Sequence, residues 1–215
     1  MVVDNMTYED VINEYIKDLP EVNNKIHTYH EYNRKKERRF MIKHKPQTLQ
    51  TIFRFNYLTK NHNTFVLEAF TYNYAYWKKE RCMLAMSMDF HYHGGRNLIF
   101  NAHGDTDLVW ITPHFIQRYN ERFLHSNGGD VAFTFLDRNN ESFSMINTQE
   151  NYDNSSFCTV NDGVILTQEI MPRVTCLKTF LSREMLKSIQ IDKDKLLMKE
   201  LNEYYKNECE YINRA

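Results

Sequence analysis

The chain lacks the cysteine patterns that cross-link small domains or hold structural zinc. Its four cysteines are widely spaced, include no C-x-x-C pair, and are Cys82, Cys158, Cys176 and Cys209. Neither a zinc knuckle nor a disulfide framework is therefore indicated, and we expect reduced, mostly buried thiols. Internal repeats and low-complexity tracts are absent as well, which excludes repeat architectures.

Long apolar runs are also missing. No run approaches the ~20 residues that a membrane span needs. The segment Met1–Leu19 is acidic and amphipathic, where a signal peptide would be basic and then apolar. We therefore expect a cytoplasmic protein with no membrane partner. The net charge of −1 indicates no partner by itself, so only local clustering of the 27 Lys and Arg residues could point to nucleic acid.

Hydrophobic residues make up 42% of the 215 residues and aromatic residues 14%, enough to fill a substantial core. The pattern of elements predicts an α+β protein with a mainly antiparallel sheet and a packed central helix. We expect a helical, basic N-terminal region over residues 1–63, an α+β core domain over 64–182 and a helical C-terminal tail over 183–215.

The N-terminal region is predicted to hold three helices. Thr7 and Asp10 form a capping-box pattern, and apolar residues keep helical spacing as far as Leu19. Pro20 suits the opening of a second helix, which would run into the basic block that begins at Arg34. The spacing over residues 47–58 is ambiguous between helix and strand, and we favour helix.

Period-two alternation and turn residues predict the strands of the core and the start of the tail. Ser182 is a good N-cap for a helical tail that would run to Ala215 with a break near Ile191. The Asn161-Asp162-Gly163 sequence predicts a tight hairpin turn. The expected strands cover residues 65–71, 84–90, 97–102, 107–111, 131–136, 142–146, 157–160, 164–169 and 173–180.

The densest set of reactive side chains lies on a helix predicted from Pro113 to about Leu124. Thr112 can cap this helix, and Pro113 fits its first position, where the missing N–H costs nothing. At 100° per residue the helix has a polar face and an apolar face. The polar face holds His114, Arg118, Glu121, Arg122 and His125, and the apolar face holds Phe115, Ile116, Tyr119 and Phe123.

The polar face has the parts of a catalytic site. A neutral imidazole at His114 could accept a proton, while Arg118 and Arg122 could hold an anion in a fork. Cleavage of RNA through its own 2′-hydroxyl needs such a base, an acid for the leaving oxygen and cations for the phosphate, but no metal. The alternative is an ordinary surface helix whose charges are solvated opposite a buried stripe.

The helix with His-x-x-x-Arg-x-x-x-Arg, the antiparallel strands after it and a late strand bearing Lys178-Thr179 together resemble a known group. This order is similar to the barnase, EndoU, colicin and RelE superfamily of bacterial metal-independent ribonucleases, over residues 112–182 only. The resemblance implies that His114 matches the helix histidine, that Arg118 and Arg122 match the helix arginines, and that Lys178 or Thr179 takes the late-strand position. It further implies a toxin-like endoribonuclease without a cofactor and with a neutralising protein partner.

A basic segment before the core supplies a second candidate surface, with Tyr29, Tyr32 and Phe40 interleaved. Such a run is usually a solvated face, but cations beside aromatic rings also suit single-stranded RNA. An alternative to catalysis is therefore that the chain is a binding module for nucleic acid or protein. The candidate RNA-binding residues are Arg34, Lys35, Lys36, Arg38, Arg39, Lys43 and Lys45.

Histidines near two turns form a rival constellation. An H-x-H pattern on a strand would put His91 and His93 on one face, as many divalent-metal sites require. Together with His103, Asp105 and His114, they could make a metal-dependent hydrolase or nuclease. The adjacent glycines place two of these clusters at turns, where exposed histidines are common.

Overall fold

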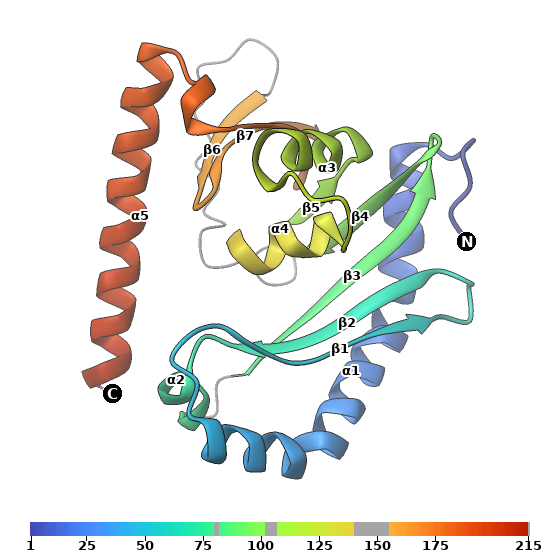
Figure 1. Cartoon of the computed structure of the whole chain (residues 1–215). Coiled ribbons are helices and arrows are strands. Elements are labelled where there is room, and N and C mark those ends of the chain that lie inside the picture. The colour runs from blue at the N-terminus through green and yellow to red at the C-terminus, as the bar shows by residue number, and fades with distance from the viewer. Residues whose placement is uncertain (80–81, 102–106, 140–154, 215) are drawn as a thin grey trace. The chain divides into compact units, whose positions relative to one another are not determined.

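The computed structural model describes residues 1–79, 82–101, 107–139 and 155–214, with the backbone alone described at 155 and 204–214. The chain divides into two units, Met1–Asn101 and Ala102–Ala215. Both combine helices with mainly antiparallel strands, and the chain has a helical N-terminal region and a long C-terminal helix, which confirms the predicted α+β class (Figure 1). Among the described residues, no helix is long and apolar enough to cross a membrane.

The first unit is a four-stranded antiparallel sheet with one long helix packed on it. The strands follow one another in sequence order, and α1 contacts β2 and β3 (Figure 1). The elements are α1 (Tyr8–His44), β1 (Gln50–Leu58), β2 (Thr64–Thr71), α2 (Tyr74–Lys78), β3 (Met83–Tyr92) and β4 (Gly95–Asn101).

The capping box at the start of α1 is confirmed, but the expected division at Pro20 is wrong. Thr7 and Asp10 cap each other's backbone N–H groups, and the helix then continues through Pro20 to His44. A proline inside a helix costs about 3 kcal/mol, through a lost hydrogen bond and a steric clash. Burial of one apolar stripe on both sides of it offsets that cost. The stripe consists of Val11, Ile12, Tyr15, Val22, Ile26 and Met41.

The segment 47–58 forms a strand rather than the expected helix. β1 pairs antiparallel with β2 from Gln50 to Leu58. Phe53 and Phe55 lie two residues apart and both contact Tyr29 of α1, with ring centroids 4.9 and 4.3 Å away. Period-two spacing puts the two rings on one face of a strand, so packing against α1 decides between helix and strand here.

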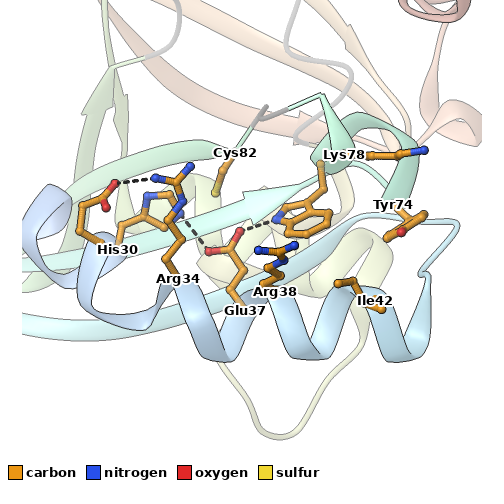
Figure 2. Close-up of a pocket in the computed structure, with 10 residues that line it drawn as sticks. His30, Arg34, Glu37, Arg38, Ile42, Tyr74, Lys78 and Cys82 are labelled. Atoms are coloured by element: carbon orange, nitrogen blue, oxygen red, sulfur yellow. Dashed lines mark hydrogen bonds and ion pairs between the residues drawn. The ribbon is translucent and has the colours of Figure 1, made fainter.

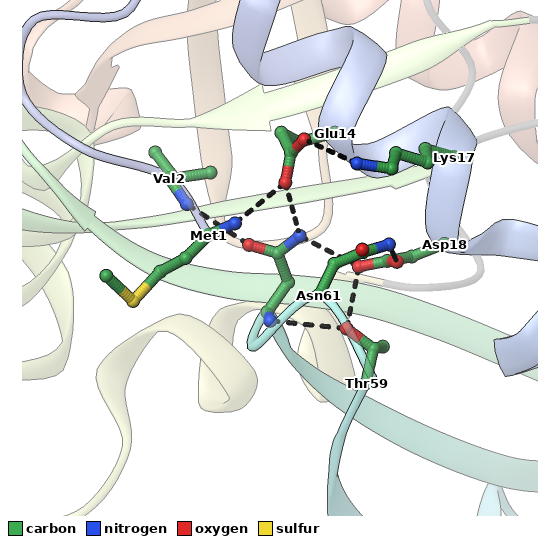
Figure 3. Close-up of polar contacts among 8 residues, drawn as sticks. Met1, Val2, Glu14, Lys17, Asp18, Thr59 and Asn61 are labelled. Carbon is green, nitrogen blue, oxygen red and sulfur yellow. Dashed lines mark hydrogen bonds and ion pairs between the residues drawn. The ribbon is translucent and has the colours of Figure 1, made fainter.

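A buried carboxylate holds α1 to the turn between β1 and β2 (Figure 3). Asp18 is 1% exposed. It accepts hydrogen bonds from Thr59 Oγ1 at 2.8 Å, Asn61 Nδ2 at 2.5 Å and Asn63 Nδ2 at 2.8 Å. The domain boundary expected after residue 63 thus falls inside the first unit, in a turn that is bonded to α1.

The second unit is built from four strands in the order β5-β8-β7-β6. The pair β5–β8 is parallel, and β8–β7 and β7–β6 are antiparallel. The Asn161-Asp162-Gly163 turn between β6 and β7 is confirmed. The elements are β5 (Leu108–Ile111), α3 (Pro113–Tyr119), a π-helical turn (Asn120–Leu124), α4 (Val131–Asn139), β6 (Ser155–Val160), β7 (Gly163–Met171), β8 (Val174–Leu181), a 3-10 turn (Arg183–Met185) and α5 (Ser188–Arg214).

The strand expected at 131–136 is wrong, because this segment is α4. The alternation of Phe133 and Phe135 resembles a half-buried strand. Asp130, however, starts a helix: its carboxylate accepts from the Phe133 N–H at 3.2 Å, and its carbonyl accepts from the Thr134 N–H at 2.8 Å. A cap one residue before the alternating pattern therefore outweighs strand propensity. The strand expected at 142–146 lies outside the described residues.

The helical tail is present, but the expected cap at Ser182 and the expected break near Ile191 are both absent. Ser182 precedes a 3-10 turn and makes no side-chain cap. α5 begins at Ser188 and runs without a break through Ile191, whose N–H donates to the Lys187 carbonyl at 2.9 Å. No glycine or proline lies between Ser188 and Arg214, so nothing in the backbone chemistry ends the helix at Ile191.

Aromatic packing joins α3 to α4 and β8. Phe115 and Tyr119 are buried, and the rings of Phe135 and Phe180 meet Tyr119 edge-on at 5.1 and 5.0 Å between centroids. Phe123 contacts Phe180 at 6.0 Å. The predicted apolar face of the central helix is thus confirmed. Edge-to-face ring pairs of this kind stabilise the fold beyond the contribution of the buried area alone.

Asp162 in the β6–β7 turn ties the two helices to the hairpin. Its carboxylate accepts hydrogen bonds from Tyr119 Oη at 2.7 Å, from Arg138 Nε and Nη2 at 2.8 Å each, and from Asn139 Nδ2 at 3.0 Å. Burial alone would raise the pKa of Asp162, but the hydrogen bonds from Arg138, Tyr119 and Asn139 outweigh it and lower the pKa below its ordinary value of 3.8. The turn is further fixed by Gly163, where a Cβ would lie 2.5 Å from the Leu181 carbonyl oxygen.

Asp162→Asn should lower the free energy of unfolding by about 2 kcal/mol at neutral pH, because it removes the charged acceptor of four hydrogen bonds from three side chains. The native-state pKa is depressed, so this stabilisation is complete above the ordinary value of 3.8 and is lost as the pH falls below it. Urea unfolding of both proteins at pH 7 and at about pH 2 measures the difference. An unchanged difference at low pH would mean that the carboxylate charge is not its source.

Candidate functional site

The start of the central helix is as predicted. Thr112 caps α3 by accepting a hydrogen bond from the Phe115 N–H at 3.2 Å, and Pro113 occupies the first turn. The Thr112 hydroxyl also donates to the Leu177 carbonyl of β8 at 3.1 Å. The cap therefore fixes the helix on the strand and leaves the His114 side chain exposed in the first turn.

Both helix arginines contact groups of the protein itself. Arg118 Nη1 lies 2.7 Å from Glu121 Oε2. Glu121 accepts hydrogen bonds from Gln117 and Arg118, and these lower the pKa of its carboxyl group, the bond from Gln117 having the larger effect. Arg122 Nη1 donates to the Phe180 carbonyl at 2.5 Å and to Thr179 Oγ1 at 3.4 Å. A phosphate at this face would have to compete with the partners of both cations.

The late strand brings only one of its two candidate residues to the helix. In the β7–β8 register Leu166 faces Thr179 and Thr167 faces Leu177, so Lys178 is the extra residue of a bulge. Lys178 is exposed, whereas Thr179 contacts Arg122. Arg122 and Thr179 are therefore together as expected, and Lys178 is not placed with them.

The rival histidine cluster does not have the expected strand geometry. β3 ends at Tyr92, and His93 adopts the left-handed conformation with φ +48°. Its N–H donates to Asp4 Oδ1 at 2.7 Å. The turn interrupts the alternation that would align His93 with the exposed His91. His103 and Asp105 lie outside the described residues.

A pocket of about 600 Å³ in the first unit lies between the C-terminal part of α1 and the α2 region (Figure 2). Arg34 and Arg38, one helical turn apart, contribute from α1. Tyr74, Trp77 and Lys78 contribute from α2, which Asn73 caps by accepting from the Tyr76 N–H. The Tyr74 and Trp77 rings are half-buried and stacked, with an interplanar angle of 24°.

The floor of this pocket holds a buried carboxylate. Glu37 is 6% exposed and accepts a hydrogen bond from Trp77 Nε1 at 2.5 Å, and His30 Nε2 lies 3.0 Å from its other oxygen (Figure 2). Cys82 is close by, and burial followed by the negative charge of Glu37 raises the pKa of its thiol to about 12. The ligand atoms of His30, Glu37 and Cys82 all lie within 4.8 Å of one another.

The predicted basic segment is exposed along the last third of α1, but only part of it belongs to the pocket. Arg34 and Arg38 line the pocket. The aromatic and ligand-bearing side chains of the pocket were missed by sequence reasoning, although the dense Tyr and Trp content of residues 72–77 is a usable signal. The remaining exposed candidates are Lys35, Lys36, Arg39, Lys43 and Lys45.

Comparison of the chain with protein-family models, with curated proteins and with solved structures finds no match.

The two helix arginines should differ in their effect on stability. Arg122→Ala should lower the free energy of unfolding by about 1–2 kcal/mol, because the Phe180 carbonyl loses a charged donor. Arg118→Ala, which removes the same charge from an exposed ion pair, should cost less than about 1 kcal/mol. Urea unfolding of the two variants tests this, and equal losses would contradict a bracing role for Arg122.

Proposed function

We propose that the first unit binds single-stranded RNA at the pocket between α1 and α2. The observation that carries the proposal is the combination of the Arg34 and Arg38 guanidiniums with the half-buried Tyr74 and Trp77 rings around one cavity. Single-stranded nucleic acids are held by cations along the backbone and aromatic rings under the bases. Lys78, also on the pocket wall, adds a third cation.

The weak ion pair made by Arg34 at the edge of the pocket supports the same function. The ion pair between Arg34 and Glu31 is long, at 3.6 Å, and its side chains are 59% and 66% exposed. An exposed pair of this kind contributes little, so a phosphate can replace Glu31 at low cost. The other cations of this part of α1 are exposed and could contact phosphates of a longer RNA strand.

Replacing both arginines by glutamine should weaken binding of a labelled single-stranded RNA by about 10-fold or more in fluorescence polarisation. The slope of log affinity against log salt should also become shallower by roughly 1.4, since each phosphate contact on a single strand contributes about 0.7. The matched control is Lys195→Gln with Lys199→Gln, which removes two exposed charges from α5.

Two results would contradict this proposal. One is a wild-type affinity that does not change between low and moderate salt. The other is an equal loss in the α5 control, because a loss that follows net charge alone needs no pocket.

Metal-independent cleavage of RNA by the second unit is a second candidate function. It is favoured by one observation: α3 packs on β8, and Arg122 of the π-helical turn that follows α3 has its Nη1 3.4 Å from Thr179 Oγ1, while the exposed His114 lies in the first turn of α3. His114 would act as the base, Arg118 and Arg122 as cations at the phosphate, and Thr179 or His125 as the remaining donor. This candidate function has less support than RNA binding, because Arg118 and Arg122 already contact groups of the protein itself.

His114→Ala should abolish EDTA-resistant cleavage of a labelled RNA mixture, with a loss of about 10²–10⁴ in rate and little change in RNA affinity. Arg118→Ala and Arg122→Ala should weaken both cleavage and affinity. His27→Ala, an exposed histidine of α1, is the control. Wild-type cleavage by the His114 variant would remove this candidate, and binding without any cleavage would leave RNA binding as the function.

A further inference from the structure

Three potential metal ligands converge at the floor of the pocket from two separate segments. His30 and Glu37 lie seven residues apart on α1, which puts them two turns apart on one helix face. Cys82 comes from the segment just before β3 and faces them (Figure 2). Within the described residues, this is the one group of three or more histidine, cysteine or acidic side chains whose ligand atoms lie close enough to share an ion.

We propose that His30, Glu37 and Cys82 bind one zinc ion whose fourth position opens into the pocket. An imidazole nitrogen, a carboxylate oxygen and a thiolate sulfur are the three ligand types of protein zinc sites. A thiolate does not suit magnesium or calcium, which prefer oxygen ligands. Three protein ligands with one open position are typical of zinc sites that hold a water or an anion.

The His30–Glu37 pair needs only a small adjustment to take the ion, and Cys82 Sγ, which lies within 4.8 Å of both ligand atoms, would move inward to about 3.5 Å from them. Two ligands at ~2.0–2.1 Å from a tetrahedral zinc lie roughly 3.3 Å apart. His30 Nε2 and Glu37 Oε2 are 3.0 Å apart, so they would separate by a few tenths of an ångström. His30 would bind as the neutral ring, and Cys82 would release its thiol proton to solvent as the sulfur–zinc bond forms.

The surroundings suit a zinc ion in two respects. The Trp77 Nε1–H donates to Glu37 Oε1, which orients the carboxylate as outer hydrogen bonds do around bound metals. The charges of one carboxylate, one thiolate and the ion cancel. A neutral centre of this kind is compatible with the nearby guanidiniums of Arg34 and Arg38, and its open position could take water or an anion oxygen that these cations also contact.

Titration of the reduced, chelator-treated full chain with Co²⁺ as a spectroscopic probe tests the site, because cobalt replaces zinc and reports its ligands. We expect one equivalent to bind with tetrahedral visible bands and a thiolate charge-transfer band, and Zn²⁺ to displace it. Cys82→Ser and His30→Gln should each weaken Zn²⁺ binding by about 100-fold or more. Cys176→Ser and His27→Gln are the controls, one cysteine and one histidine away from the cluster.

Alkylation of the wild-type chain avoids any dependence on variants that fold poorly. Zinc should slow the modification of Cys82 and leave Cys158 and Cys176 unchanged, as mapped by mass spectrometry. A cobalt spectrum without a thiolate band, the same spectrum in Cys82→Ser, or no protection of Cys82 would each overturn the proposal. The metal alone is the probe throughout, so failure of RNA binding would not affect the result.

Discussion

The continuity of α1 through Pro20 is the constraint on which the first unit depends. One helix carries Asp18, bonded to the β1–β2 turn, and the His30 and Glu37 pair of the pocket floor. A break at Pro20 would let these two attachments move independently. Because the buried stripe continues on both sides of the proline, the position of the pocket residues follows from packing far away along the same helix.

The second unit has a comparable constraint of a different chemical kind. Asp162 gathers donors from α3 and α4 onto one buried carboxylate, and the same network raises the pKa of Tyr119 through burial and then through Asp162. Any exposed chemistry at His114 would depend on this network, because it holds the opposite face of the helix. Arg122 also attaches this helical segment to β8 by donating a hydrogen bond to the Phe180 carbonyl. One of the two arginines that could hold an anion therefore also stabilises the fold.

Elements with a local chemical signal could be predicted, and elements decided by distant packing could not. The Thr7–Asp10 and Thr112–Pro113 starts and the Asn161-Asp162-Gly163 turn depend on neighbouring residues, and all are present. The strand at 50–58 depends on a contact with Tyr29, which no window around Phe53 contains. α4 was mispredicted although Asp130 is a local signal, because alternating aromatic residues received more weight than a cap.

The candidate pocket also depends on contacts between distant parts of the chain, and it could not be predicted from the sequence. The basic run of α1 was interpreted as one charged surface, yet helical periodicity turns Glu37 and Met41 inward while Arg34 and Arg38 stay outside. A carboxylate buried within a run of cations needs partners, and here they are Trp77 and His30, with Cys82 beside them. Two of the four groups come from residues 77–82, so the site arises only when the chain returns to α1 after β2. An acidic residue at an inward position of a basic helix is therefore the feature of the sequence that marks a possible ligand site.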